Sequence, residues 1–168
     1  MKFSIRNFRK NDIAVIASAF AALGWYDRTT LLKSYLLERS KTERKVLVAS
    51  TENIFTGYVT ILWRSDYPPF AERAIPEIKD LNVLPVYRRI GIGGKLLDKA
   101  EGLISKRSDV AGIGVGMFSD YGAAQRLYVK RGYVPDARGL FYHGEYIKPE
   151  QQITVDGDLV LYMRKLLR

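Results

Sequence analysis

One short segment, residues 86–95, combines the residue types best suited to binding an anion. It contains Arg88, Arg89, Gly91, Gly93, Gly94 and Lys95. Glycine lets a backbone turn sharply and come close to a ligand. The first N–H groups of a helix lack intrahelical partners and carry the positive end of the helix dipole. If a helix begins here, the segment is suited to hold a phosphate or pyrophosphate group.

The spacing of these glycines excludes two familiar nucleotide-binding motifs. A dinucleotide fingerprint needs a further glycine at position 96, and a P-loop needs Ser or Thr there, after a Gly-Lys pair. The chain has Leu96 at that position. The remaining alternatives are a different anion-binding loop or a tight turn between a strand and a helix on a basic surface.

The segment resembles the acetyl-CoA signature of the GCN5-related N-acetyltransferases (GNAT), Arg/Gln-x-x-Gly-x-Gly/Ala between a strand and a helix. Arg88, Gly91 and Gly93 match it at the right spacing. A second family motif, Ala-x-x-Leu-Tyr followed by a Gly-aromatic pair, is matched by residues 124–128 and 132–133. Because both motifs occur in the family's order and both ends look similar too, the resemblance covers nearly all of the chain.

The resemblance implies acetyl-CoA as co-substrate, with no metal, and direct attack of a primary amine on the thioester. The cofactor-binding residues that it implies are Leu81, Val83, Arg88, Arg89, Gly91, Ile92, Gly93, Gly94 and Lys95. The loop N–H groups would hold the pyrophosphate, and the strand edge at Leu81 to Val83 would pair with the pantetheine arm. The N–H of Val83 would stabilise the oxyanion. One departure is Tyr121, which stands where many members have an asparagine that contacts the cofactor.

The same resemblance points to three candidate catalytic residues. Tyr128 matches the tyrosine with which several members protonate the departing sulfur; alternatively, it packs beside Leu127 with its hydroxyl at the surface. Glu77 stands 11 residues before Arg88, the separation of the catalytic glutamate in histone-acetylating members. Asp80 is nearer the acid of polyamine-type members. The alternatives are that both carboxylates are solvated strand charges and that a chain of waters removes the proton.

Other residues bear on the acceptor site, on catalysis and on metal binding. Tyr67, Tyr142 and Tyr146 are candidates for an acceptor site, although several of the 11 tyrosines must fall in such loops by chance. The single histidine, His143, is expected to be an exposed loop residue. With no cysteine in the chain, disulfides, thiolate metal sites and a cysteine nucleophile are excluded, and a zinc site would need mostly carboxylate ligands.

Hydrophobic periodicity predicts the elements that must position these residues. Strands are expected at residues 2–6, 46–49, 55–63, 77–83, 111–117, from 133 onward and at 159–163, and helices at 13–23, where Gly24 ends the first one, 29–38, 92–104 and 121–131. Asn11 or Asp12 is expected to cap the first helix, residues 51–53 to form a hairpin turn, and residues 67–70 to form a loop. The segment 159–163, apolar on both faces, is expected inside a sheet.

This order of elements predicts a mixed α/β fold. Period-2 spacing places Phe55, Val59, Ile61 and Trp63 on one face of a strand. No repeat or linker divides the 168 residues, so one domain is expected over residues 1–168. With the resemblance, the prediction becomes a single GNAT-like domain whose mixed, mostly antiparallel sheet is flanked by helices.

The charge balance adds a preference for anionic partners. The net charge is +9, and residues 86–107 contribute +4 of it, from 6 basic and 2 acidic residues. Coenzyme A carries a pyrophosphate and a ribose phosphate, which accounts for that share. The remaining +5 disfavours a highly cationic acceptor such as a polyamine, unless local acidity at the acceptor site overrides it.

Two other classes of function remain as alternatives: a basic nucleic-acid-binding module and an acyl-CoA-binding protein without turnover. Basic residues are spread along the chain without a recognisable nucleic-acid motif, which disfavours the first. The intact Arg88, Gly91, Gly93 and Tyr128 disfavour the second. No stretch is apolar enough to span a membrane and the N-terminus lacks a signal-peptide pattern, so a cytoplasmic enzyme is expected. Its partner would be a small-molecule or peptide amine, and the family often forms homodimers.

Overall fold

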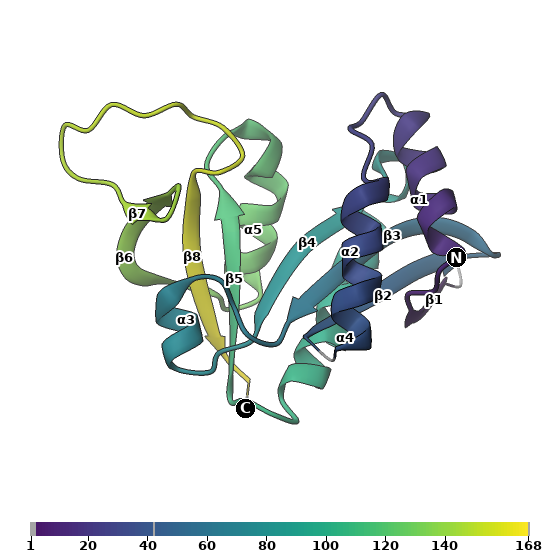
Figure 1. Ribbon diagram of the computed structural model, residues 1–168, viewed down its shortest axis with the longest axis horizontal. Helices are drawn as coiled ribbons and strands as arrows, with labels where there is room; N and C mark the ends of the chain where they lie inside the picture. The colour runs from purple at the N-terminus through teal and green to yellow at the C-terminus, as the bar shows by residue number, and fades with distance from the viewer. Residues whose placement is uncertain (1–2, 42, 168) are drawn as a thin grey trace. The chain divides into compact units, whose positions relative to one another are not determined.

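The computed structural model describes residues 3–41 and 43–167, without the side chains of residues 39 and 40, and within them shows an α/β fold (Figure 1). Eight strands of this part of the chain form one sheet in the order β1-β2-β3-β4-β5-β8-β6-β7. β4 and β5 are parallel, whereas β1–β2, β2–β3, β5–β8, β6–β8 and β6–β7 are antiparallel. The predicted fold class, a mixed and mostly antiparallel sheet flanked by helices, is confirmed. Lys2, the first residue of the expected first strand, lies outside the described residues.

The elements form two compact units. Residues up to Trp63 and Lys79–Gly102 make unit 1, and Arg64–Ile78 and residues from Leu103 make unit 2. The strands are β1 (Phe3–Asn7), β2 (Arg44–Thr51), β3 (Ile54–Leu62), β4 (Glu77–Val83), β5 (Val110–Gly116), β6 (Val134–Tyr142), β7 (Glu145–Tyr146) and β8 (Val160–Leu166). The α-helices are α1 (Asp12–Ala21), α2 (Thr29–Ser40), α3 (Pro68–Glu72), α4 (Ile92–Ile104) and α5 (Gly122–Lys130), with short 3-10 turns η1 (Pro85–Tyr87) and η2 (Ser119–Tyr121).

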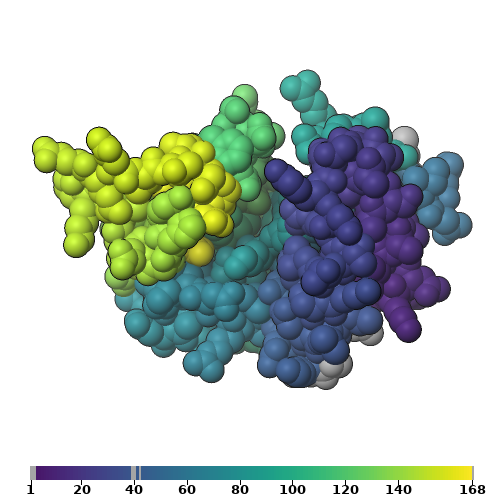
Figure 2. Space-filling model, turned by 45° about the horizontal axis from the view of Figure 1, so that its top comes forward, coloured from purple at the N-terminus to yellow at the C-terminus, as the bar shows by residue number. Residues whose placement is uncertain are grey.

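In unit 1, α1 and α2 cover one face of β2 and β3 (Figure 1). The buried cluster beneath them includes Ile16, Phe20, Leu32 and Val48. The side chains of the two helices form a continuous purple and blue surface in Figure 2. Leu47 points to the opposite face of β2, because strand side chains alternate, and it lines a small hollow together with Lys99 of α4.

The β2–β3 hairpin confirms the predicted turn and corrects one predicted face. Glu52 and Asn53 have φ of +48° and +67°, as a two-residue type I′ turn requires. The register then shifts beside Ala49, which adds a bulge to the ladder. Because the bulge breaks the alternation, Phe55 packs with Tyr58 in the α1–α2 cluster, ring centroids 6.5 Å apart. The expectation that Phe55 shares a face with Val59 was therefore wrong.

The predicted cap of α1 is also corrected. The side chain of Asn11 makes no capping hydrogen bond. Asp12, the first helical residue, instead accepts hydrogen bonds from the Arg6 guanidinium at 2.6 and 2.7 Å and from the N–H of Arg9 at 2.7 Å. Burial alone would raise the pKa of Asp12, but these hydrogen bonds lower it on balance. Asp12 therefore ties β1 to the start of α1 rather than capping the helix.

In unit 2, β8 lies between β5 and β6, as its apolar faces predicted. The segment expected to be a loop at residues 67–70 instead begins the short helix α3. Pro68 and Pro69 occupy its first two positions, where a missing N–H costs nothing and the fixed φ suits a helix. The chain between β7 and β8 lies at the surface of this unit, in yellow-green in Figure 2.

Three alternating glycines on β5 make room for a layer of aromatic rings. A Cβ on Gly112 would lie 2.3 Å from the Phe70 ring, one on Gly114 3.1 Å from Tyr162, and one on Gly116 2.3 Å from Tyr121. These separations are shorter than van der Waals contact, so no side chain fits there. The rings of α3, β8 and η2 can therefore lie directly on the strand.

This packing predicts that Gly112→Ala destabilises the fold. The added methyl must displace Phe70, which is 2% exposed, and overpacking of this kind costs about 3 kcal/mol. Urea denaturation should show a lower midpoint with an unchanged slope. Gly102→Ala is the matched control, because a Cβ at this site in α4 meets nothing within 4 Å. Equal stability of the two variants would contradict the packing argument.

Candidate functional site

The predicted anion-binding loop lies in unit 1, between β4 and α4. After η1, Arg89 has φ of +64° and Gly91 φ of +92°, and α4 begins at Ile92. The first bond of the helix runs from the N–H of Lys95 to the carbonyl of Gly91, at 3.0 Å. The N–H groups of Ile92 and Gly93 precede this bond and have no intrahelical partner. The loop thus ends on a helix N-terminus, the arrangement that binds phosphate groups.

The loop carries three basic side chains at the surface. Arg88 donates from Nε to the carbonyl oxygen of Val83 at 2.9 Å, and its guanidinium lies 5.9 Å from the centre of the Trp25 ring. Lys95 lies 3.7 Å from Asp98, but both side chains are more than half exposed, so this pair is weak. Arg88 therefore ties the loop to the end of β4, and the positive charge faces solvent.

The strand segment before this loop is held by a close backbone approach. A Cβ on Gly57 of β3 would lie 2.5 Å from the carbonyl oxygen of Asn82 and 3.1 Å from Cα of Val83. The N–H of Leu84 donates to the carbonyl of Thr56 at 2.9 Å. Only glycine at position 57 allows β4 this position. Sequence reasoning missed Gly57, because the contact depends on a neighbouring strand rather than on a motif.

Asp80 is surrounded by hydrogen-bond donors. Its Oδ1 accepts from Arg28 at 2.5 Å and from Asn82 at 2.7 Å. Its Oδ2 accepts from Tyr58 at 2.6 Å and from Tyr35 at 3.0 Å. Burial and the charge of Asp80 raise the pKa of both tyrosines, so their hydroxyls stay protonated and keep donating. Each carboxylate oxygen of Asp80 therefore accepts two hydrogen bonds, and the φ of +55° at this residue marks an irregular point in β4.

The Asp80 cluster continues through Tyr35 into the interior of unit 1. The Arg44 guanidinium lies 4.3 Å from the centre of the Tyr35 ring, and it pairs with Glu38 at 2.5 Å. Arg44 also donates to the Thr60 hydroxyl, which donates in turn to the carbonyl of Lys79. The network thus links α2, β2, β3 and β4 beside the loop.

Glu77 lies in unit 2 and is only 2% exposed, so the expectation of a solvated strand charge was wrong. Its Oε2 accepts from the Ser65 hydroxyl at 2.5 Å, and the same hydroxyl oxygen accepts from the N–H of Tyr67. The carboxylate is therefore desolvated and oriented. Its burial results from the pairing of β4 with β5, where Glu77 faces Gly112.

Tyr128 also lies in unit 2, on α5. It is 5% exposed, and its ring centroid is 6.0 Å from that of Tyr133. The ring of Tyr128 is therefore packed inside this unit. Tyr121, which stands where the family pattern has asparagine, is the last residue of η2 and packs edge-on against Phe118 at 5.0 Å. Its ring covers Gly116, so the residue serves the packing of this unit.

Of the three tyrosines predicted for an acceptor site, the structure brings two together. The Tyr67 hydroxyl donates to Asp136 at 2.6 Å and lies 3.0 Å from the Tyr146 hydroxyl. Tyr142 instead donates to Asp156 at 3.1 Å. Asp136 was missed, because it belongs to no motif and lies 69 residues from Tyr67.

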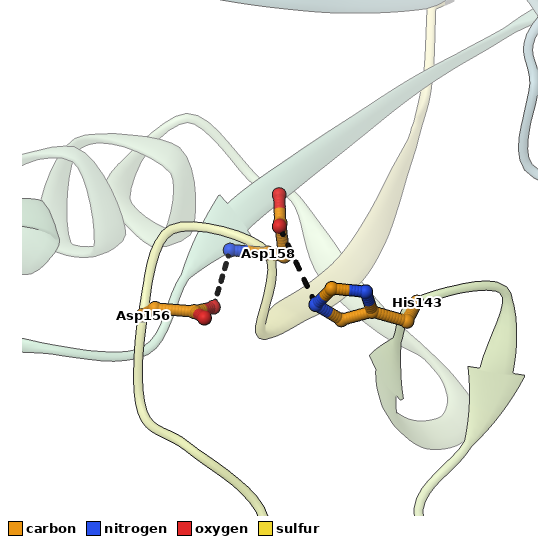
Figure 3. Close-up of side chains that lie close together, drawn as sticks. All are labelled: His143, Asp156 and Asp158. Carbon is orange, nitrogen blue, oxygen red and sulfur yellow. Dashed lines mark hydrogen bonds and ion pairs between the residues drawn. The ribbon is translucent and has the colours of Figure 1, made fainter.

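His143 is exposed, as predicted, and lies beside two aspartates (Figure 3). Its Nε2 is 3.5 Å from Asp158, and potential ligand atoms of His143, Asp156 and Asp158 lie within 4.8 Å of one another. Asp156 already accepts from the N–H of Asp158 and from Tyr142. Because local loop hydrogen bonds explain this grouping, we assign no metal to it.

Comparison with known proteins identifies the family. Residues 42–135 match the family model of the acetyltransferase (GNAT) domain. This match covers more than half of the chain, so the protein belongs to the GNAT acetyltransferase family, and the predictions of that family and of an acyltransferase are confirmed. A search of curated proteins found no match. Among the described residues, no helix has the length and apolar character needed to cross a membrane.

Many solved structures share the fold. An N-acetyltransferase from Staphylococcus aureus is 15% identical, with a TM-score of 0.71 and all of both chains covered. The yncA protein of Salmonella typhimurium, solved with its cofactor acetyl-CoA, is 22% identical, with a TM-score of 0.68 over 100% of this chain and 95% of that one. A chimera of spermidine N-acetyltransferase SpeG from Vibrio cholerae and hSSAT is 15% identical, with a TM-score of 0.70 and coverages of 99% and 96%.

Proposed function

We propose that the protein is an acetyl-CoA-dependent N-acetyltransferase that acetylates a primary amine by direct attack of the amine on the thioester. The observation that carries this proposal is the loop from Arg88 to Lys95, where Gly91 turns the chain at φ +92° into the start of α4. The likeness of the fold to yncA, which was solved with acetyl-CoA, supports it. The acceptor would be a small molecule or a peptide, and nucleic acid is not a partner in this proposal.

The loop fits the pyrophosphate of coenzyme A. A Cβ on Gly91 would meet nothing within 4 Å, so the space over the loop is open to a ligand. The N–H groups of Ile92 and Gly93 would donate to phosphate oxygens, and Arg88, Arg89 and Lys95 would balance their charge. In this proposal, residues 1–168 form one acetyltransferase domain. The enzyme is proposed to act in the cytoplasm.

Acetyl-CoA, when bound, supplies an acetyl group activated as a thioester. In this proposal the edge of β4 at Leu81 and Val83 pairs with its pantetheine arm. The N–H of Val83 donates to the carbonyl oxygen, which becomes negative as the amine adds. Arg88, which holds the carbonyl of Val83, helps to fix the orientation of this segment.

Two proton transfers complete the reaction, because the amine loses a proton and the sulfur gains one. Tyr128 is proposed to donate its hydroxyl proton to the departing sulfur. Glu77 is the candidate base in this proposal, because its carboxylate is 2% exposed and is oriented by Ser65, whereas each oxygen of Asp80 accepts two hydrogen bonds. A water chain can serve in place of Glu77.

Ligand-induced stabilisation tests the proposal. Acetyl-CoA at about a hundred times its dissociation constant should stabilise the fold by roughly 2.7 kcal/mol, read as a higher Tm. Tyr128→Phe should keep this stabilisation but lower kcat about a hundredfold, the usual scale of acid catalysis, in an assay of free thiol release with a panel of primary amines.

Tyr133→Phe is the control, because it removes the hydroxyl of the neighbouring buried ring and leaves the proposed proton donor in place. No stabilisation by acetyl-CoA would contradict the proposal. Stabilisation without thiol release for any amine would indicate an acyl-CoA-binding protein without turnover. An unchanged kcat for Tyr128→Phe would remove only the role of Tyr128.

A further inference from the structure

Tyr67 holds a fixed position in the core of unit 2. It is 1% exposed, and its ring stacks on Tyr162 at 3.7 Å with an interplanar angle of 7°. The edges of Phe70 and Phe141 close two further sides, at 4.9 and 5.1 Å. A ring packed in this way cannot turn, so its hydroxyl stays between Asp136 and Tyr146.

The side chains of Tyr146, Tyr67 and Asp136 form a hydrogen-bonded chain, which we call the relay. The hydroxyl hydrogens within this relay can be assigned. A carboxylate only accepts hydrogen bonds, so the single hydroxyl hydrogen of Tyr67 goes to Asp136, at 2.6 Å. Burial raises the pKa of Tyr67, as do its hydrogen bonds to Asp136 and Tyr146, so this hydrogen is kept. In the 3.0 Å contact between the two tyrosines, Tyr146 must therefore be the donor. Its own hydrogen is used inside the protein, and its oxygen can offer solvent only lone pairs.

Charges of both signs lie around this relay. Burial is the main cause that raises the pKa of Tyr162, and the negative charges of Glu77, Asp66 and Asp136 raise it further. Three carboxylates are therefore close enough to affect the ring that stacks on Tyr67. Arg138 has its Nε 3.9 Å from Asp136 and a side chain that is 43% exposed, and Arg73 and Arg164 line the same hollow as Asp136. The charges around the relay are therefore balanced, and the hydrogen-bond acceptor at Tyr146, rather than the local field, selects the ligand.

We propose that the hydroxyl oxygen of Tyr146 binds an N–H of the acceptor amine in its ammonium form. Tyr146 is 38% exposed, so a ligand can reach it. Its oxygen accepts but does not donate, and its hydrogen bond to Tyr67 and, through it, to Asp136 strengthens it as an acceptor. The inference that the amine is the acetylated acceptor rests on the proposed function.

Binding of two probes that share a benzyl group tests the proposal. Benzylamine is a cation with N–H donors at pH 7, whereas benzyl methyl ether is neutral and has no donor. With the full chain, measured by NMR titration, benzylamine should bind about tenfold more tightly than the ether, the scale of a hydrogen bond to a charged group. In Tyr146→Phe the two affinities should differ by less than about twofold. A wild-type protein without this preference, or a Tyr146→Phe variant that keeps it, would overturn the proposal.

Two further variants test whether the preference for the amine depends on the orientation of the Tyr146 hydroxyl or on the loss of any neighbouring tyrosine hydroxyl. Tyr67→Phe keeps Tyr146 but frees its hydrogen to point outward, so the preference for the amine should fall as affinity for the ether rises. Tyr142→Phe is the matched control, since its hydroxyl also donates to a carboxylate, that of Asp156, outside the relay. It should keep the wild-type preference. A preference lost in Tyr142→Phe but kept in Tyr67→Phe would contradict the assignment.

Together with the acetyl-CoA test, these experiments distinguish a failure of the Tyr146 proposal from a failure of the proposed function. Stabilisation by acetyl-CoA without an amine preference refutes the Tyr146 site alone. An amine preference without stabilisation by acetyl-CoA refutes the acetyltransferase proposal, and with it the role of the amine as acceptor. Where both hold, Tyr146→Phe should raise KM for the amine about tenfold and leave KM for acetyl-CoA unchanged.

Discussion

Gly91→Val should remove nearly all stabilisation by acetyl-CoA. A β-branched residue strongly disfavours a φ of +92°, so the loop must rearrange, and the N–H groups of Ile92 and Gly93 would turn away from a ligand. If the dissociation constant rises a hundredfold, a ligand concentration that stabilises the wild type by roughly 2.7 kcal/mol stabilises the variant by only about 0.4 kcal/mol. A thermal-shift titration measures both values.

Gly132→Val separates backbone strain from ligand binding. Gly132 has φ of +88° and open space around a Cβ, but it follows α5 in unit 2. This variant should lose stability as Gly91→Val does and keep the full stabilisation by acetyl-CoA. If Gly91→Val also keeps it, the assignment of the pyrophosphate to this loop is wrong.

Asp80→Ala should destabilise the fold strongly. The change leaves the guanidinium of Arg28 and the hydroxyls of Tyr58 and Tyr35 without their acceptor, and it puts alanine at a φ of +55°. Breaking a buried pair costs about 3–5 kcal/mol; since Arg28 is 31% and Asp80 13% exposed, we expect about 3 kcal/mol in urea denaturation. Asp98→Ala, at an exposed pair, should cost under about 0.5 kcal/mol.

Asp80→Asn distinguishes structural support from base catalysis. Asparagine tolerates positive φ and keeps one acceptor oxygen, so the variant should fold with a smaller loss of stability. Because the proposal assigns the role of base to Glu77, kcat/KM of this variant should keep the acidic limb of its pH profile. Loss of that limb in Asp80→Asn, with stability near that of the wild type, would reinstate Asp80 as the base.

The sequence predicted the features that depend on neighbouring residues. The glycines before α4 and the Tyr128 motif are local patterns, because a helix start and a helix face are built within a few residues. The same holds for the turn at Glu52 and Asn53, which needs only two residues of positive φ. Period-2 and helical periodicity located every strand except β7, which has only two residues.

Features that depend on distant residues could not be predicted. Asp80 meets Tyr58, Tyr35 and Arg28 across 22, 45 and 52 positions, so its pattern reads as an ordinary strand carboxylate. Asp136 and Tyr67 are equally remote. Phe55 lies on the face opposite to the predicted one because of a β-bulge, and no residue type in the sequence indicates this bulge. In each case the tertiary environment, rather than local propensity, decides what the side chain does.

The alternating glycines of β5 also fix how this strand can pair. Gly112, Gly114 and Gly116 lie under aromatic rings, and the residues that alternate with them, Ala111, Ile113 and Val115, are buried on the other face. A slip of one residue would exchange the two faces and put isoleucine and valine where even a methyl group clashes. Alignments of β5 that are shifted by one residue are thus excluded by sterics as the chain folds.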